Sequence, residues 1–223
     1  MRRTIRSFVV RAGRMSPRQQ HGFDVLLKNY ALPLDNKIWN FTKIFNNDVE
    51  VIIEIGFGMG ASLLEMAKNA PMQNFIGIEV HQAGVGSLAA DLQDSEINNV
   101  RIVNFDAVEI LKNYIPENSL SGVQIFFPDP WHKKRHNKRR LIQSEFIKLL
   151  VTRLKTSGFI HCATDWEDYA LQMFDVLTGD VLITNCNDDG GFIERPESRP
   201  ITKFEKRGNK LGHGVWDLKF KKL

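Results

Sequence analysis

Short apolar runs alternate with amphipathic stretches along most of this chain, from about residue 50 onward. The apolar runs are rich in β-branched and aromatic residues and predict strands, whereas the amphipathic stretches have the spacing of helices. Repeated strand-helix units build a parallel sheet that is covered by helices. We therefore expect an α/β fold, a doubly wound, mostly parallel seven-stranded sheet with helices on both faces. The expected strands are 51–55, 75–78, 100–104, 122–127, 158–163, 181–186 and 214–220, and the expected helices are 62–68, 82–92, 107–114, 141–154 (ended by Gly158) and 166–177.

An acidic residue stands at the end of each of the first five expected strands: Glu54, Glu79, Asp106, Asp129 and Asp165. The first four are 25, 27 and 23 residues apart, and each interval is one strand-helix-strand period. Ligands of such sheets bind beyond the carboxyl ends of the strands, near the point where the strand order reverses. A single acid there is often only a helix N-cap, and Asp165 fits that role. Five acids along one expected edge instead indicate a binding site.

A glycine-rich loop follows the first strand and opens the first helix, with the sequence Glu54-Ile-Gly56-Phe-Gly58-Met-Gly60-Ala61. Glycines in such a loop allow a tight turn and the close approach of a ligand to the backbone. The pattern also fits a dinucleotide-binding fingerprint in which Glu79 holds ribose hydroxyls, so the loop alone leaves two cofactors open. Glu54 favours S-adenosylmethionine over NAD, because a carboxylate beside the loop repels a pyrophosphate and attracts a sulfonium and an ammonium.

Positive charge is concentrated in two segments of the chain. Residues 133–140 hold six Lys and Arg within eight positions, shortly after Asp129, and the first 23 residues hold six Arg and no acid. Without these 12 charges the net charge of +4 would be −8. Charge runs are often merely solvated, but this segregation beside a strand end predicts a contact surface for nucleic acid.

The composition argues against several other classes of protein. No window approaches the roughly 18 to 20 apolar residues that span a membrane, and the N-terminus lacks the apolar stretch of a secretory signal. Cys162 and Cys186 fall in separate expected strands, so we predict no disulfide framework and a reducing, cytoplasmic location. His132 and His136 are four residues apart, but the three residues between them are cationic, so we predict no metal site.

Six segments are long or unusual enough to indicate a family: IRSFVVRAGRMSPRQ (5–19), EIGFGMGASLLEMAKNAP (54–71), GIEVH (77–81), FFPDPWHKKRHNKRR (126–140), ATDWEDYA (163–170) and RPESRPITKFEKRGNKLGHGVWDLKF (195–220). In these segments the chain resembles the bacterial tRNA (guanine-N7)-methyltransferase family. The resemblance implies a class I, Rossmann-like methyltransferase fold, S-adenosylmethionine as cofactor, S-adenosylhomocysteine as product and no metal. It also implies tRNA as the partner and N7 of the guanine at position 46 in the variable loop as the methylated atom, which gives 7-methylguanosine.

The resemblance also implies a role for each matching residue. Asp129 is the expected catalytic residue and also an expected cofactor contact, and two catalytic roles stay open for it: holding the guanine edge or stabilising the developing positive charge. The expected cofactor contacts are Glu54 and the backbone of Gly56, Gly58 and Gly60 at the methionine end, Glu79 at the ribose, and Asp106 with Ala107 at the adenine. The expected RNA contacts are Lys133, Arg135, His136, Asn137, Lys138, Arg139, Arg140, Asp165, Thr202, Lys203, Phe204 and Glu205.

We expect a basic N-terminal arm at 1–30 that packs on or extends a methyltransferase domain at 31–223. The expected protein is a monomer or homodimer with no membrane association and no obligatory protein partner.

Three alternatives stay open. The first is a methyltransferase of the same fold with another target. Sites for exocyclic amines commonly have Asn or Asp followed by Pro-Pro and an aromatic residue, and the segment 127–131 departs from that pattern. The second is an NAD-dependent oxidoreductase, for which we find no hydride-transfer site. The third is a non-catalytic RNA-binding protein, which the intact acids Glu54, Glu79 and Asp106 argue against.

Overall fold

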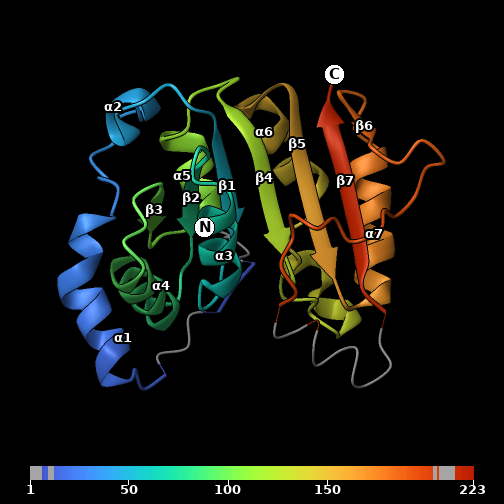
Figure 1. Ribbon diagram of the computed structural model, residues 1–223. Coiled ribbons are helices and arrows are strands. Elements are labelled where there is room, and N and C mark those ends of the chain that lie inside the picture. Colours follow the sequence, from blue (N-terminus) through green and yellow to red (C-terminus); the bar gives the residue numbers. More distant parts are fainter. Residues whose placement is uncertain (1–6, 10–12, 203–204, 206–213) are drawn as a thin grey trace.

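A seven-stranded sheet forms the centre of the computed structural model, which describes residues 7–9, 13–202, 205 and 214–223 (Figure 1). The strand order is β3-β2-β1-β4-β5-β7-β6. Strands β1 to β5 run parallel, and β7 runs antiparallel to both of its neighbours. The predicted fold class is therefore confirmed. The strands are β1 (Val51–Ile55), β2 (Asn74–Ile78), β3 (Val100–Val103), β4 (Leu120–Phe126), β5 (Leu154–Thr164), β6 (Ile183–Asn185) and β7 (Trp216–Lys222).

Helices alternate with the parallel strands, as the sequence pattern predicts. The α-helices are α1 (Pro17–His21), α2 (Phe41–Phe45), α3 (Ala61–Asn69), α4 (Gln82–Asp94), α5 (Ala107–Asn113), α6 (Ser144–Arg153) and α7 (Glu167–Thr178). A π-helical turn η1 (Gly22–Leu26) and two 3-10 helices, η2 (Leu27–Asn29) and η3 (Lys134–Arg139), complete the set that the structure describes. None of these helices is long and apolar enough to cross a membrane.

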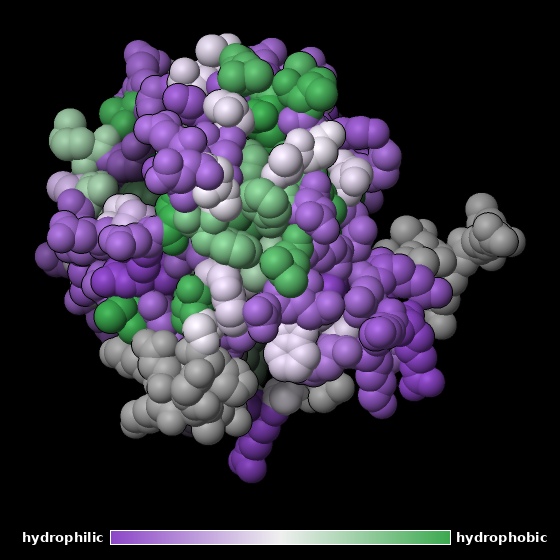
Figure 2. All heavy atoms as spheres, turned by 90° about the vertical axis from the view of Figure 1, so that its right-hand side faces the viewer, coloured by the Kyte–Doolittle hydropathy of each residue, from purple (hydrophilic) through white to green (hydrophobic). Residues whose placement is uncertain are grey.

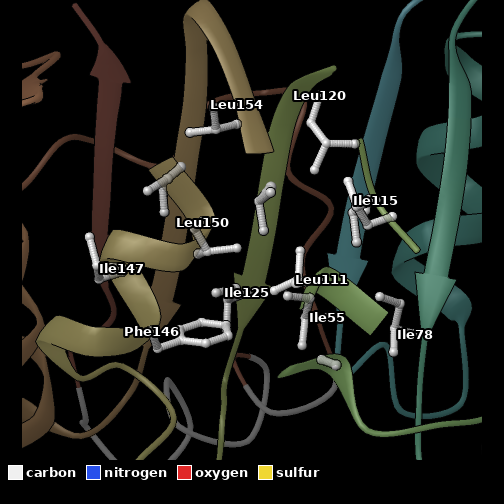
Figure 3. Packing of buried hydrophobic residues seen from close by; sticks show 14 of the residues in the cluster. Ile55, Ile78, Leu111, Ile115, Leu120, Ile125, Phe146, Ile147, Leu150 and Leu154 are labelled. Atoms are coloured by element: carbon white, nitrogen blue, oxygen red, sulfur yellow. The ribbon is translucent and has the colours of Figure 1, made fainter. Parts of the chain in front are cut away.

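Alternate residues of the strands pack into two hydrophobic clusters on opposite faces of the sheet. Ile53 and Ile125 lie in the larger cluster, which α5, α6 and α7 cover. Figure 3 shows this cluster, in which Phe146 and Ile147 of α6 pack among residues of the sheet. Phe75 belongs to the smaller cluster, which α3 and α4 cover. Each fully buried aliphatic or aromatic side chain stabilises the fold by roughly 1.5–3 kcal/mol, so the two clusters fix the sheet between its helical layers.

The N-terminal segment folds back onto α4, as Figure 1 shows for α1. Arg18 of α1 forms ion pairs with Asp91 (2.7 Å) and Asp94 (2.6 Å) of α4. The backbones meet closely here, because a Cβ added at Gly22 would lie 2.0 Å from the carbonyl oxygen of Gly86. Residues 17–29 therefore pack on the domain, whereas the boundary that we predict at residue 30 stays a prediction.

The predicted helix 141–154 is too long at both ends. Its first residues are not helical, because the N–H of Ile142 donates to Tyr169 Oη (3.0 Å), and α6 begins at Ser144. Gly158 does not end this helix, because β5 begins at Leu154, directly after α6, and contains Gly158. A Cβ at Gly158 would lie 2.8 Å from the carbonyl oxygen of the first residue of β4, so close packing of two strands explains this glycine.

The surface on the α7 and β7 side of the molecule is unevenly polar (Figure 2). Hydrophobic side chains such as Leu171, Val181 and Leu182 are exposed on α7 and in the segment before β6. Strongly hydrophilic residues project from the lower edge in the same view. That edge is at the level at which β4 and β5 end in Figure 1.

Candidate active site at the carboxyl edge of the sheet

The five acids of the strand ends lie along one edge of the sheet, as the sequence predicts. Strands β1 to β5 are parallel and adjacent in the order β3-β2-β1-β4-β5, so their carboxyl ends share one edge, which we call the carboxyl edge. Along it the acids follow the order Asp106, Glu79, Glu54, Asp129 and Asp165. The strand order reverses between β1 and β4, and ligands of doubly wound sheets bind at this position.

The loop between β1 and α3, residues 56–60, is the glycine loop. Gly56, Gly58 and Gly60 have positive φ angles of 77°, 59° and 84°, which L side chains rarely adopt. The N–H of Gly58 donates to Glu79 Oε2 (2.9 Å), and a Cβ at Gly60 would lie 2.7 Å from Leu88. Around Gly56 and Gly58 a Cβ would meet nothing within 4 Å, so a ligand can approach the backbone there.

Two buried acceptors lie next to the glycine loop. Glu54 on β1 is paired in register with Gln124 on β4, so both side chains point to the same face of the sheet. Both residues are buried, and neither Glu54 Oε2 nor Gln124 Oε1 has a hydrogen-bond partner among the described residues. Burial, and to a lesser extent the charge of Glu79, raises the pKa of Glu54 to about 8. Because unpaired buried acceptors are costly, this pair fits a cationic donor such as the ammonium of an amino acid.

Gln124 is not among the site residues predicted from the sequence. The signal that could have found it is a single amide within the strand-forming run 122–127, since buried polar residues in strands usually have a partner.

Two acids on the β2–β3 side of the edge organise the backbone around them. Glu79 Oε1 accepts from the N–H of Val80 (2.7 Å) and His81 (2.9 Å), and its second oxygen holds the glycine loop. Asp106 caps α5 by accepting from the N–H of Val108 (2.9 Å), and Ala107 starts that helix as a buried residue. A carboxylate oxygen has more than one lone pair, so both acids can still accept hydroxyl or amine donors of a ligand.

Asp129 lies in an exposed turn just beyond the end of β4. Phe127 before it and Trp131 after it have positive φ angles of 51° and 47°. Asp129 Oδ1 accepts from the N–H of Trp131 (3.0 Å), which fixes the turn. At the end of neighbouring β5, the ring of Trp166 lies 4.3 Å from the ring of His132, measured between centroids. Asp129 is thus presented at the carboxyl edge, in the turn that precedes His132.

Residues 133–140 form the basic turn, whose centre is η3. The side chains of Lys133, Lys134, Arg135 and Lys138 are exposed and can reach a polyanion. The Arg139 guanidinium instead lies 3.9 Å from the centroid of the Trp131 ring.

The N-terminal segment contacts this same region. Trp131 Nε1 donates to the carbonyl of Ser7 (3.0 Å), and Arg139 Nη2 donates to that of Phe8 (3.4 Å). Residues 7–8 therefore lie against the basic turn, although α1 packs far along the sheet on α4.

One predicted phosphate contact, Arg140, is wrong. The Arg140 side chain is buried and donates to Asp168 Oδ2 (2.6 Å), Gln172 Oε1 (2.6 Å) and the carbonyl of Pro130 (2.8 Å). Its guanidinium also lies 4.8 Å from the centroid of the Tyr169 ring. Arg140 therefore anchors the basic turn to α7 and does not face RNA.

The predicted RNA contact of Glu205 is also corrected, because this side chain is buried. Its carboxylate accepts from the guanidinium of Arg199 (2.7 Å), and its N–H donates to Thr202 Oγ1 (3.2 Å). Thr202 itself is partly exposed and stays a candidate contact. Lys203 and Phe204 lie outside the described residues.

Comparisons with known proteins agree with this geometry. A family model described as "Putative methyltransferase" matches residues 48–218. The chain is 61% identical over 222 residues to the tRNA (guanine-N(7)-)-methyltransferase of Legionella pneumophila (strain Paris), which covers 99% of this chain and 94% of that protein. It is 52% identical over 219 residues to the protein of the same name from Idiomarina loihiensis, covering 98% of this chain and 89% of that protein.

Solved structures with the same fold are much more distant in sequence. The 16S rRNA methyltransferase KamB superposes with a TM-score of 0.62 at 11% identity, covering 83% of this chain and 94% of that chain. The aminoglycoside resistance methyltransferase NpmB1 superposes with a TM-score of 0.56 at 15% identity, covering 83% and 95%. At these identities the likeness concerns the fold.

Proposed function

This chain belongs to the bacterial tRNA (guanine-N7)-methyltransferase family, and we propose that it transfers a methyl group from S-adenosylmethionine to N7 of the guanine at position 46 in the variable loop of tRNA. The products are 7-methylguanosine in the tRNA and S-adenosylhomocysteine. The observation that carries this proposal is the 61% identity over 222 residues to a protein named for that reaction. We propose that the protein acts in the cytoplasm as a monomer or homodimer, without an obligatory protein partner and without a metal.

The carboxyl edge supplies groups that suit each part of the cofactor. The buried carboxyl of Glu54, whose Oε2 has no hydrogen-bond partner among the described residues, would pair with the amino-acid ammonium, and the backbone of the glycine loop would hold the rest of the methionine end. Glu79 would accept from the ribose hydroxyls. Asp106 and Ala107 would lie at the adenine. Bound S-adenosylmethionine supplies a methyl group on a positively charged sulfur.

Methylation of guanine N7 requires little acid-base catalysis by the protein. N7 carries a lone pair in the plane of the ring, so no proton has to leave before methylation. The catalytic task is to align the guanine and to tolerate the positive charge that it acquires. Asp129 is the catalytic candidate, because it is exposed at the end of β4 and its turn is fixed by the N–H of Trp131. It would hold the guanine edge or stabilise that charge, and Lys133, Asp165 and Thr202 would contact the substrate beside it.

The basic turn would bind the phosphates of tRNA. The exposed residues Lys134, Arg135 and Lys138 are available for this role, with His136, Asn137 and Arg139 beside them in the same turn. Such contacts position an RNA but carry no base identity, so the choice of one guanine depends on the tRNA shape and on the pocket.

A single experiment tests the proposed function. The purified protein is incubated with unmodified tRNA and methyl-labelled S-adenosylmethionine, and the tRNA is digested to nucleosides for mass spectrometry. We expect the label in 7-methylguanosine. Label in another nucleoside would contradict the target and favour a methyltransferase of the same fold with a different substrate. Binding of tRNA without any label would favour a non-catalytic RNA-binding protein.

A further inference from the structure

On one face of the sheet, near the carboxyl edge, strands β5 and β7 carry buried polar residues that are covered by a loop. The two hydrophobic clusters of the sheet are instead covered by helices. His161 on β5 and Asp217 on β7 are buried, with 3% and 2% of their surface exposed. Their neighbours Ile160, Cys162 and Leu218 belong to the core on the opposite face. The loop that follows β6 continues beside β7, where Ile193 forms an antiparallel bridge with Asp217 and its N–H donates to the carbonyl of Asp217 (2.9 Å).

Arg199 of this loop is the centre of the polar cluster, and its side chain is only 1% exposed. Nε and Nη2 donate to the two oxygens of Asp217 at 2.7 and 2.8 Å. Nη1 and Nη2 donate to the two oxygens of Glu205 at 2.7 and 3.3 Å. Asp217 Oδ1 also lies 2.7 Å from His161 Nε2. The guanidinium thus binds two carboxylates in bidentate fashion, the arrangement for which arginine is better suited than lysine.

The same guanidinium joins two segments of the proposed active site. Glu205 fixes the start of the segment with Thr202, because its N–H donates to Thr202 Oγ1 (3.2 Å). The Arg199 guanidinium carbon also lies 5.8 Å from the ring centroid of Phe126 and 5.7 Å from that of Phe127. Phe127 has a positive φ of 51° and comes two residues before Asp129. Arg199 is therefore in contact with the turn that presents the catalytic candidate and with the segment that presents Thr202.

We propose that Arg199 is a positioning residue for the RNA substrate. Acting through Glu205 and Phe127, it holds Thr202 and Asp129 in the correct relative position at the carboxyl edge. This inference rests on the proposed function of that site. Arg199 is itself too buried to touch tRNA, although it is basic and lies in a segment expected to bind RNA. Without its charge, Asp217 and Glu205 would face each other across a buried space, and their repulsion would displace the loop that carries Glu205.

The position of the cluster separates this role from general stabilisation. The two hydrophobic clusters hold the sheet and its helices together, and Arg199 meets the smaller one at Phe126, where its guanidinium carbon lies 5.8 Å from the ring centroid. The acids expected at the ammonium, the ribose and the adenine of the cofactor lie at the carboxyl ends of β1 to β3, whereas the Arg199 cluster includes residues of β5 and β7. Loss of Arg199 should therefore impair the use of tRNA much more than the binding of the cofactor.

The test uses three variants of the full chain: Arg199→Met, which removes the charge, Arg199→Lys, which keeps it without the bidentate geometry, and Arg153→Met as a control. Arg153 is also largely buried, with 13% of its side chain exposed, and pairs with Glu117 (3.6 Å) at the end of α6. We expect Arg199→Met to raise the KM for tRNA and lower kcat, by about tenfold or more together, with S-adenosylhomocysteine affinity changed less than about twofold. The KM for tRNA and the kcat of Arg199→Lys should lie between those of Arg199→Met and those of the wild type. The control Arg153→Met should have the wild-type values of KM and kcat.

Hydrogen exchange gives a readout that does not depend on methylation. In Arg199→Met we expect faster amide exchange at residues 197–202 and at Phe127, with unchanged exchange in β1 to β3. If the wild-type chain forms no 7-methylguanosine, the proposed function fails, but tRNA affinity and this exchange pattern still decide the role of Arg199. Unchanged exchange and tRNA affinity in Arg199→Met would overturn the inference. An equal loss of cofactor and tRNA binding would also overturn it, because it would show a general structural role.

The dependence on Glu205 can be tested separately with a double-mutant cycle. If Arg199 acts through Glu205, adding Glu205→Gln to Arg199→Met should lower kcat/KM by no more than about twofold further, because the shared contact is already lost. Fully additive losses would contradict an action through Glu205.

Discussion

The carboxyl of Glu54 offers a test in which stability and cofactor binding change in opposite directions. Its side chain is 2% exposed, and burial raises its pKa from the ordinary value of 4.5 to about 8, with a smaller contribution from the charge of Glu79. In the unfolded chain this carboxyl loses its proton near pH 4.5, whereas the folded, ligand-free protein retains the proton until about pH 8. The unfolded state is therefore favoured progressively as the pH rises between these values.

The size of this effect follows from the pKa difference. Each pH unit between 4.5 and about 8 lowers the free energy of unfolding by about 1.4 kcal/mol, which amounts to about 5 kcal/mol above pH 8. Glutamine resembles the protonated carboxyl in shape and has no proton to lose. We expect Glu54→Gln and the wild type to be similarly stable near pH 4.5, and the variant to be more stable by up to about 5 kcal/mol at pH 8.5.

Urea denaturation of the ligand-free proteins at several values of pH measures this difference directly. Glu65→Gln is the matched control, because Glu65 is an exposed glutamate on α3 and its replacement should change stability little. Glu54→Gln should at the same time bind S-adenosylhomocysteine more weakly, since a neutral amide cannot pair with the ammonium. A stability difference between Glu54→Gln and the wild type that does not change with pH would refute the reasoning.

Three further predictions concern the other parts of the site. Asp129→Ala should lower the rate of tRNA methylation by about 100-fold or more while S-adenosylhomocysteine still binds in calorimetry, and full turnover would end its catalytic assignment. Replacing Lys134 and Arg135 by serine should reduce the slope of log affinity for tRNA against log salt by up to about 1.4–1.8, since each lost phosphate contact accounts for about 0.7–0.9; an unchanged slope would mean that the basic turn is merely solvated. Gly84→Ala should weaken cofactor binding, because the added Cβ would lie 2.0 Å from a carbonyl oxygen of the glycine loop; Gly13→Ala, which has nothing within 4 Å, should have no such effect, and equal affinities would refute this contact.

Much of the fold follows from the sequence because its signals are local. The run Val51–Ile55 is predicted as a strand with the bounds that β1 has, and from that strand onward the order of strands and α-helices is also predicted correctly, whereas α1 and α2 are not predicted. The error at residues 141–143 has a tertiary cause, since Ile142 is held by the hydroxyl of Tyr169 on another helix. A hydrogen-bond partner that lies 27 residues away does not affect the local spacing of apolar residues from which the helix is predicted.

The site was predictable wherever position along a strand determines which edge a residue occupies. Glu54 and Asp129 were placed at the carboxyl edge by this argument alone, whereas the burial of basic residues could not be predicted in the same way. Arg139 and Arg140 are adjacent and chemically identical, yet only Arg140 is buried, because Asp168 of α7 faces it. Arg199 was missed for the same reason, since its partners come from separate parts of the chain.

The central claim is that N7 of guanine 46 receives the methyl group. A tRNA that carries 7-deazaguanine at this position tests it most directly, because a C–H group replaces N7 while the shape and the Watson-Crick edge of the base are retained. We predict that this tRNA binds like unmodified tRNA and gains no labelled methyl group, whereas tRNA with guanine at position 46 is methylated. Equal incorporation of label into both tRNAs would contradict the account.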